Sequence, residues 1–112
     1  MAPPDSKQRL AELTDAWRRD TSNVSVLTDL AKLEEELGEL DRARTHFRAL
    51  LLMRLDGSVM TQADVFYHLA LLDHRSGDTP KARAMAERAL AADATHALAC
   101  ELLARLRAPP GQ

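Results

Sequence analysis

An internal repeat constrains this chain more than any other feature of its sequence. Its landmarks are apolar-alanine pairs, glycines and single small or apolar residues that return after a fixed interval. Leu30-Ala31 returns as Leu69-Ala70, Gly38 as Gly77, Ala43 as Ala82 and Leu51 as Leu90, each time 39 residues later. A constant interval at four places is hard to obtain by chance, and it predicts one helix–turn–helix unit used twice.

The apolar residues recur at helical spacing throughout the chain. Leu10, Leu13 and Trp17, for example, form one apolar stripe of a first helix. Breakers and caps divide the chain into six predicted helices, which cover residues 6–19, 24–37, 40–55, 62–76, 79–92 and 95–107. No segment alternates with a period of two for long enough to predict a strand. The predicted fold class is therefore all-α, with six helices.

Local signals set several of these boundaries. Gly38 and Gly77 end the second and fourth helices, where a left-handed backbone is needed and glycine adopts it most easily. Thr61 and Asp64 form a capping box that opens the fourth helix, and Asp78 is the predicted N-cap of the fifth. The third helix is almost continuously apolar over residues 50–53, and we expect it to be well buried.

Composition excludes several functions. The chain has 112 residues, a net charge of −2 with the two signs interspersed, and 4% aromatic residues. A core of mainly Leu and Ala suits closely packed helices, and the missing basic surplus argues against nucleic-acid binding. No apolar run approaches the length of a membrane span. A lone cysteine, Cys100, allows no internal disulfide and fits a reducing, cytoplasmic setting.

Two segments resemble the tetratricopeptide repeat (TPR) family, whose unit is about 34 residues long. Its opening pattern is matched by Leu27-x₂-Leu30-Ala31 and Phe66-x₂-Leu69-Ala70, and its second-helix pattern by Ala43-x₃-Phe47 and Ala82-x₃-Ala86. The sequence departs from the family where Glu34 and Asp73 replace the usual tyrosine, and where Leu55 and Ala94 replace the closing proline. The 39-residue interval exceeds the family unit by about five residues, and we assign this surplus to residues 58–62.

The resemblance extends outward to half-units. It predicts a single domain over residues 1–112 that holds a half-unit helix at 6–20, one repeat at 24–57, a second at 63–96 and a capping helix or half-unit at 97–108. Alanines at the helix crossings would let paired helices approach closely. The implied architecture is a right-handed superhelical array of antiparallel helix pairs, a TPR-like α-solenoid.

In the resembled family, the first helix of each unit lines a concave groove that binds a peptide or helix of another protein. Transferring that register predicts a partner-binding groove lined by Thr28, Lys32, Glu35, Tyr67, His68, Leu71, His74, Arg75, Leu98, Glu101 and Arg105. Tyr67 and Leu71 carry most weight, because they would otherwise be apolar groups left in water. Members that bind chaperone tails hold a carboxylate with Lys and Asn. Thr28, Lys32 and His68 stand at those positions, so we expect no such binding.

Catalytic and metal sites are not predicted, and neither is a cofactor. His68 and His74 are too far apart in register for a shared metal ion, and His46 and His96 have no acidic neighbour in sequence, so all four are expected to be surface histidines. Cys100 falls on the apolar stripe of the sixth helix and is expected to be a buried structural thiol.

A second functional hypothesis is self-association, or a structural spacer role, through the end helices. Leu98 and Leu102 add a second apolar stripe to the sixth helix, which has no successor to cover it. An exposed patch there would support a homodimer. The leading hypothesis remains a non-catalytic protein–protein interaction module or scaffold without a nucleic-acid or membrane partner.

Overall fold

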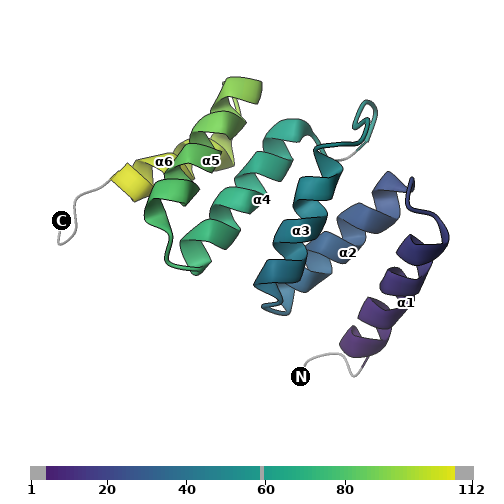
Figure 1. The fold of residues 1–112 in the computed structure, drawn as a ribbon. Coiled ribbons are helices and arrows are strands. Elements are labelled where there is room, and N and C mark those ends of the chain that lie inside the picture. The colour runs from purple at the N-terminus through teal and green to yellow at the C-terminus, as the bar shows by residue number, and fades with distance from the viewer. Residues whose placement is uncertain (1–4, 59, 108–112) are drawn as a thin grey trace. The chain divides into compact units, whose positions relative to one another are not determined.

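The computed structural model describes residues 5–58 and 60–107. In these parts of the chain, helices joined by turns and loops are the only regular secondary structure (Figure 1). It holds six helices: α1 (Ser6–Arg19), α2 (Val24–Glu36), α3 (Leu40–Leu50), α4 (Gln62–Arg75), α5 (Thr79–Ala92) and α6 (Ala97–Arg107). The predicted all-α class is therefore confirmed, and five of the six helices lie within two residues of their predicted bounds. None of the described helices combines the length and the apolar character that crossing a membrane requires.

Helix α3 is the exception, because it ends at Leu50 and not at Leu55. Beyond Leu50 the backbone tightens: the amides of Leu52 and Met53 each donate to the carbonyl three residues earlier, at 3.1 Å. The expectation of a well-buried run over residues 50–53 is wrong, since Leu52 is 90% exposed. Consecutive apolar residues point around a helix or turn, so only some of them can face one core.

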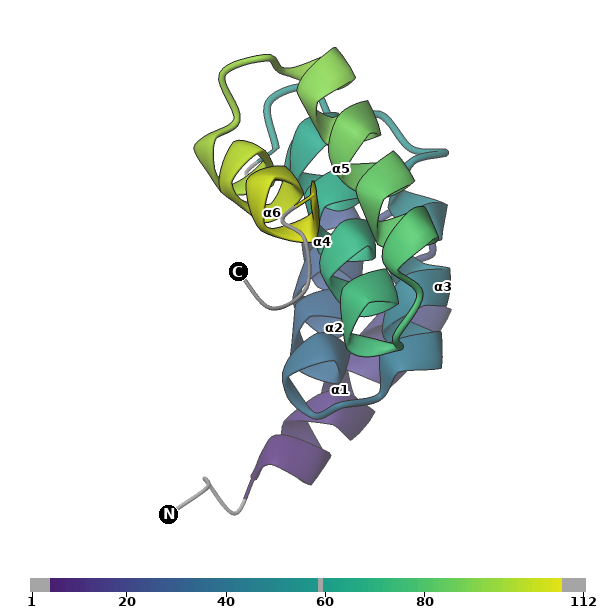
Figure 2. The same ribbon diagram turned by 90° about the vertical axis from the view of Figure 1, so that its left-hand side faces the viewer.

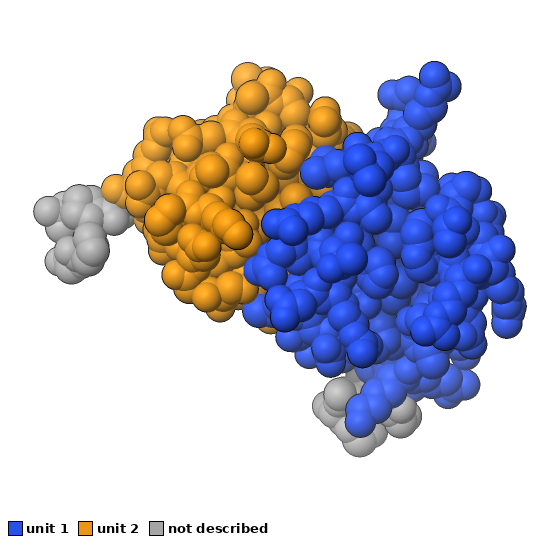
Figure 3. Space-filling view, in the orientation of Figure 1, with its two compact units in different colours: residues 1–58 blue, residues 59–112 orange. Residues whose placement is uncertain are grey.

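The chain divides into two compact units, residues 1–58 and residues 59–112 (Figure 3). Unit 1 contains α1, α2 and α3, and α2 pairs with α3 as a hairpin whose crossing alanines, Ala31 and Ala43, are fully buried. Leu27, Leu30 and Phe47 are fully buried as well. The small side chains let the helix axes approach, and the large ones fill the space beside them.

Unit 2 contains α4, α5 and α6, and its hairpin of α4 and α5 is built in the same way. Ala70 and Ala82 are fully buried at the positions of Ala31 and Ala43. They belong to a cluster with Leu102, Leu103 and Leu106 of α6. Helix α5 thus packs against both α4 and α6 (Figure 2).

The turns of the two hairpins share one hydrogen-bonding pattern. Gly38 and Gly77 have φ angles of 80° and 83°. The residue after each glycine donates its amide to the carbonyl five residues back, at 2.9 Å in both turns. This is the Schellman arrangement, which requires a left-handed residue at the glycine and explains why α2 and α4 end where the sequence predicts.

A second local motif, not predicted from the sequence, occurs once in each unit. Asp20 ends α1 and Asp93 ends α5, and each accepts hydrogen bonds from the amide and the hydroxyl of a residue two positions later, Ser22 or Thr95. These bonds lower the pKa of both aspartates. The α1–α2 and α5–α6 connections therefore share one hydrogen-bonding pattern.

Candidate protein-binding surface

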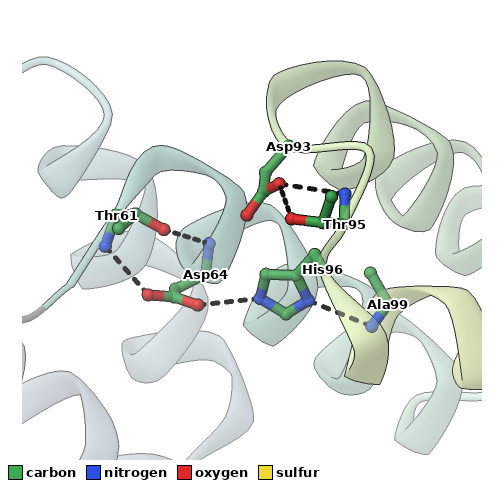
Figure 4. A network of polar contacts seen from close by, with 6 residues as sticks. All are labelled: Thr61, Asp64, Asp93, Thr95, His96 and Ala99. Carbon is green, nitrogen blue, oxygen red and sulfur yellow. Dashed lines mark hydrogen bonds and ion pairs between the residues drawn. The ribbon is translucent and has the colours of Figure 1, made fainter.

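Most of the predicted groove residues lie in unit 2, on α4 and α6. The two helices are joined where each begins: Nε2 of His96 and Oδ1 of Asp64 are 2.7 Å apart (Figure 4). The ring of Tyr67 lies 5.4 Å from that of His96 and 5.5 Å from that of His68, measured between centroids. The α4 and α6 residues are thus held in a fixed mutual position within this unit.

His96 has a defined tautomer in this arrangement. Its Nδ1 atom accepts a hydrogen bond from the amide of Ala99 at 3.1 Å and so caps α6. Because an accepting nitrogen carries no proton, the proton of the neutral ring is on Nε2, which donates to Asp64. His96 therefore fixes both the start of α6 and its distance from α4.

Asp64 is the residue where the two helix starts meet. Thr61 and Asp64 form the predicted capping box: the Thr61 amide donates to Oδ2, and the Asp64 amide donates to the Thr61 hydroxyl. Partial burial raises the pKa of Asp64, but the hydrogen bonds from Thr61 and His96 outweigh it and bring the pKa below 3.8. The carboxylate is thereby kept ionised where it accepts these bonds.

Tyr67 and Leu71 are less exposed than the sequence predicts. Both are half-buried and pack against the core cluster of unit 2. This cluster includes Leu102, Leu103 and Leu106 of α6. These two side chains therefore contribute to stability as well as to the surface, and substituting them is a poor test of binding.

The outward face of α4 and α6 is carried by other residues of the predicted set. His74, Arg75, Leu98, Glu101 and Arg105 are all exposed, and His68 is half-buried. Leu98 is 53% exposed, which is unusual for a leucine in a described helix of this chain. Leu98, Glu101 and Arg105 follow one another at helical spacing, so they form one stripe of α6.

Unit 1 contributes the three predicted residues of α2. Lys32 is exposed and Glu35 is half-buried. Thr28 is 3% exposed, and its hydroxyl oxygen has no hydrogen-bond partner among the described residues. A buried side chain offers little surface to a partner, so Lys32 is the more accessible position on this helix.

Two of the four histidines are not the surface groups that the sequence suggested. His46 of α3 places Nδ1 2.5 Å from Oε1 of Glu34 on α2, and Glu34 is 2% exposed. His96 pairs with Asp64 as described above. Both acids are remote in sequence from their histidines, so sequence neighbours gave no sign of either pair. Among the described residues, no group of three or more His, Cys, Asp or Glu is placed to hold a metal ion.

The expected burial pattern of α6 is wrong at Cys100 and Leu102. Cys100 is an exposed free thiol and not a buried one, and Ala104 is exposed too. Leu102, expected in an exposed patch, is 2% exposed and belongs to the core of unit 2. Helix α6 packs against α5 and buries Ala99, Leu102, Leu103 and Leu106. In the described chain no later helix covers Cys100 and Ala104.

A comparison with models of known protein families finds none that matches this chain, and a comparison with curated proteins finds no match either.

Proposed function

We propose that this chain is a helical-repeat module of the TPR type that binds a peptide or helix of another protein and does not catalyse a reaction. The proposed binding surface is the outward face of α2, α4 and α6, the first helices of successive helix pairs. The observation that carries the proposal is the repeated hairpin. Fully buried alanine crossings and one Schellman turn recur in both units, in the register that predicts this face.

The equivalent loops at Asp20 and Asp93 support the same register. In the proposed register α1 corresponds to α5 and α2 to α6, so α6 takes the place of a first helix, like α2 and α4. In the proposed assembly the two units stack as a right-handed solenoid, and the three first helices line one groove. The exposed stripe of Leu98, Glu101 and Arg105 supplies an apolar anchor beside charges of both signs, a combination that suits protein recognition.

We also propose a cytoplasmic location for this activity. The exposed thiol of Cys100 is the support, because an unpaired accessible cysteine persists best in a reducing compartment.

The proposal can be tested with two triple variants that change the charge equally. One alters the proposed face: Lys32→Glu, Leu98→Glu and Arg105→Glu. The other alters exposed residues elsewhere: Arg48→Glu, Leu52→Glu and Lys81→Glu. Each variant and the wild-type chain would be used to capture partners from a lysate of the source organism, with circular dichroism as the check of folding.

The proposal predicts that specific partners retained by the wild type are also retained by the second variant and lost by the first. Equal retention by both variants, with helicity intact, would exclude this face as the binding surface. Equal loss from both would point to a general charge effect and would also contradict the proposal.

Self-association through α6 is the alternative function, and it now rests on Leu98. Leu102 is unavailable because it lies in the core of unit 2. Sedimentation velocity at high concentration tests this alternative: a dimer that Leu98→Glu dissociates would favour it, and a monomer would remove it.

A further inference from the structure

Unit 1 contains a hollow that the proposed binding face does not include. It lies between α1 and α3, with α2 beneath, and its volume is about 590 Å³. Trp17 and Arg18 of α1, Arg42 of α3, and Glu34 and His46 line it. Ligand sites in proteins typically enclose roughly 300–1,000 Å³, so the hollow is large enough to receive a side chain together with its neighbour.

Two arginines approach this hollow from opposite walls. Among the described residues neither Arg18 nor Arg42 forms an ion pair. The same two residues line a smaller recess of about 290 Å³, to which the cation of Lys7 and the carboxylate of Asp15 also contribute. Like charges gathered around one hollow repel one another, and a bound anion would relieve that repulsion. Guanidinium groups are well suited to this role, since they bind carboxylates through paired hydrogen bonds.

The acidic residues that line the hollow are already engaged. Oε1 of Glu34 is bonded to His46, and Asp41 forms an ion pair with Arg44 at 2.9 Å. The cations of Arg18 and Arg42 are therefore the charges left for a ligand. Trp17, which is half-buried, supplies a flat apolar wall beside them.

We propose that this hollow binds an acidic segment of a partner protein, with a carboxylate side chain between Arg18 and Arg42 and an apolar neighbour against Trp17. A carboxylate fits better than a phosphate group. Trp17 lies beside the two arginines, and an acidic peptide segment can place an apolar neighbour against it, whereas a phosphate group alone has no apolar part to do so. The site is separate from the α2, α4 and α6 face, so the two proposals can fail independently.

Trp17 is the one tryptophan of the chain, which makes its fluorescence a direct reporter of the hollow. The full chain would be titrated with a short blocked peptide of glutamate and leucine residues spaced by glycines. Two further titrations would use the same peptide with glutamine in place of glutamate, and inorganic phosphate alone. The proposal predicts a saturable change in Trp17 emission with the acidic peptide that weakens as salt is added.

Two double variants separate the site from general charge. In Arg18→Gln with Arg42→Gln, the affinity for the acidic peptide should fall about tenfold or more, the effect of losing roughly one charge-assisted contact. Arg19→Gln with Arg48→Gln is the matched control, because it removes one exposed cation from each of the same helices without touching the hollow. Its affinity should stay within about twofold of the wild type.

Several results would overturn the proposal. One is an unchanged Trp17 emission with the acidic peptide at concentrations that saturate a weak site. Others are an equal response to the glutamine peptide and equal weakening in both double variants. A response to inorganic phosphate that exceeds the response to the peptide would replace the peptide by a small anion as the ligand. Urea denaturation of each variant verifies that the chain remains folded.

Discussion

His96 caps α6, the Asp64 carboxylate completes the capping box of α4, and the two side chains are bonded to each other, so a single contact of 2.7 Å couples the starts of α6 and α4 (Figure 4). Two helix ends that would each fray alone are thereby held together. The pair also brings the ring of His96 to Tyr67, which packs on the core of unit 2. His96 therefore contributes both to the local cap of α6 and to the tertiary packing of unit 2.

Replacing His96 should therefore cost more than removing one cap. His96→Ala loses the acceptor for the Ala99 amide and the donor to Asp64, and we expect about 2 kcal/mol of destabilisation. His96→Asn restores a capping oxygen while shortening the reach to Asp64, so it should recover about half of that loss. Urea denaturation measures both. His74→Ala, at an exposed position, is the control, and an equal loss there would contradict the role given to His96.

Acid should weaken the folded state through Asp64. The pKa of this carboxyl is lower in the folded chain than the ordinary 3.8, so its contribution is complete above about pH 3.8 and is lost as the pH falls through the folded pKa. In Asp64→Asn this part of the acid dependence should disappear. Urea midpoints measured between about pH 5 and 2.5 test the prediction, and parallel curves for the wild type and the variant would refute it.

The pair of Glu34 and His46 should behave as a buried unit. His46→Ala leaves a carboxylate that is 2% exposed without its partner, and we expect a loss of about 2 kcal/mol in unfolding free energy. Adding Glu34→Gln to that variant should reduce the loss, because the buried charge is then removed. Glu36→Gln, on the exposed side of α2, should change stability by less than about 0.5 kcal/mol. If His46→Ala changes stability no more than Glu36→Gln does, the buried pair of Glu34 and His46 is not formed.

The alanine crossings should tolerate no larger side chain. Ala31→Leu and Ala70→Leu should each destabilise the chain by about 1–3 kcal/mol, because the paired helices must separate. Ala84→Leu, at an exposed position of α5, should cost little. Thermal unfolding followed by circular dichroism compares the three. If Ala31→Leu and Ala70→Leu unfold at the temperature of Ala84→Leu, the close crossings do not exist in solution.

The sequence predicted the helices well wherever their ends depend on adjacent residues. Gly38, Gly77 and the capping box of Thr61 and Asp64 act through bonds that span five residues or fewer, and the structure has each of them. The loop motif at Asp20 and Asp93 is equally local. An aspartate followed two positions later by Ser or Thr is a signal of this motif that can be read in the sequence.

The candidate site was less predictable, because burial depends on which element covers a residue. Tyr67 and Leu71 were expected to face water, yet both are half-buried and pack against the core cluster of unit 2. Cys100 was expected to be buried and is exposed, and Leu102 was expected to be exposed and is buried. The face of α6 that packs in unit 2 is therefore not the face that the sequence predicted. A helical stripe is wide enough for two neighbouring faces to look equally apolar in sequence.

The sequence by itself determined that this chain forms short helices in a repeated hairpin register, since helix propensity, caps and left-handed glycines act within a turn or two of the backbone. Only the tertiary structure decided which acids meet His46 and His96, and that Trp17 lines a hollow between α1 and α3. The physical reason is distance along the chain. His46 lies 12 positions from its acid in the chain, and His96 lies 32 positions from its acid. Such contacts exist only after the helices have packed, so no local preference specifies them.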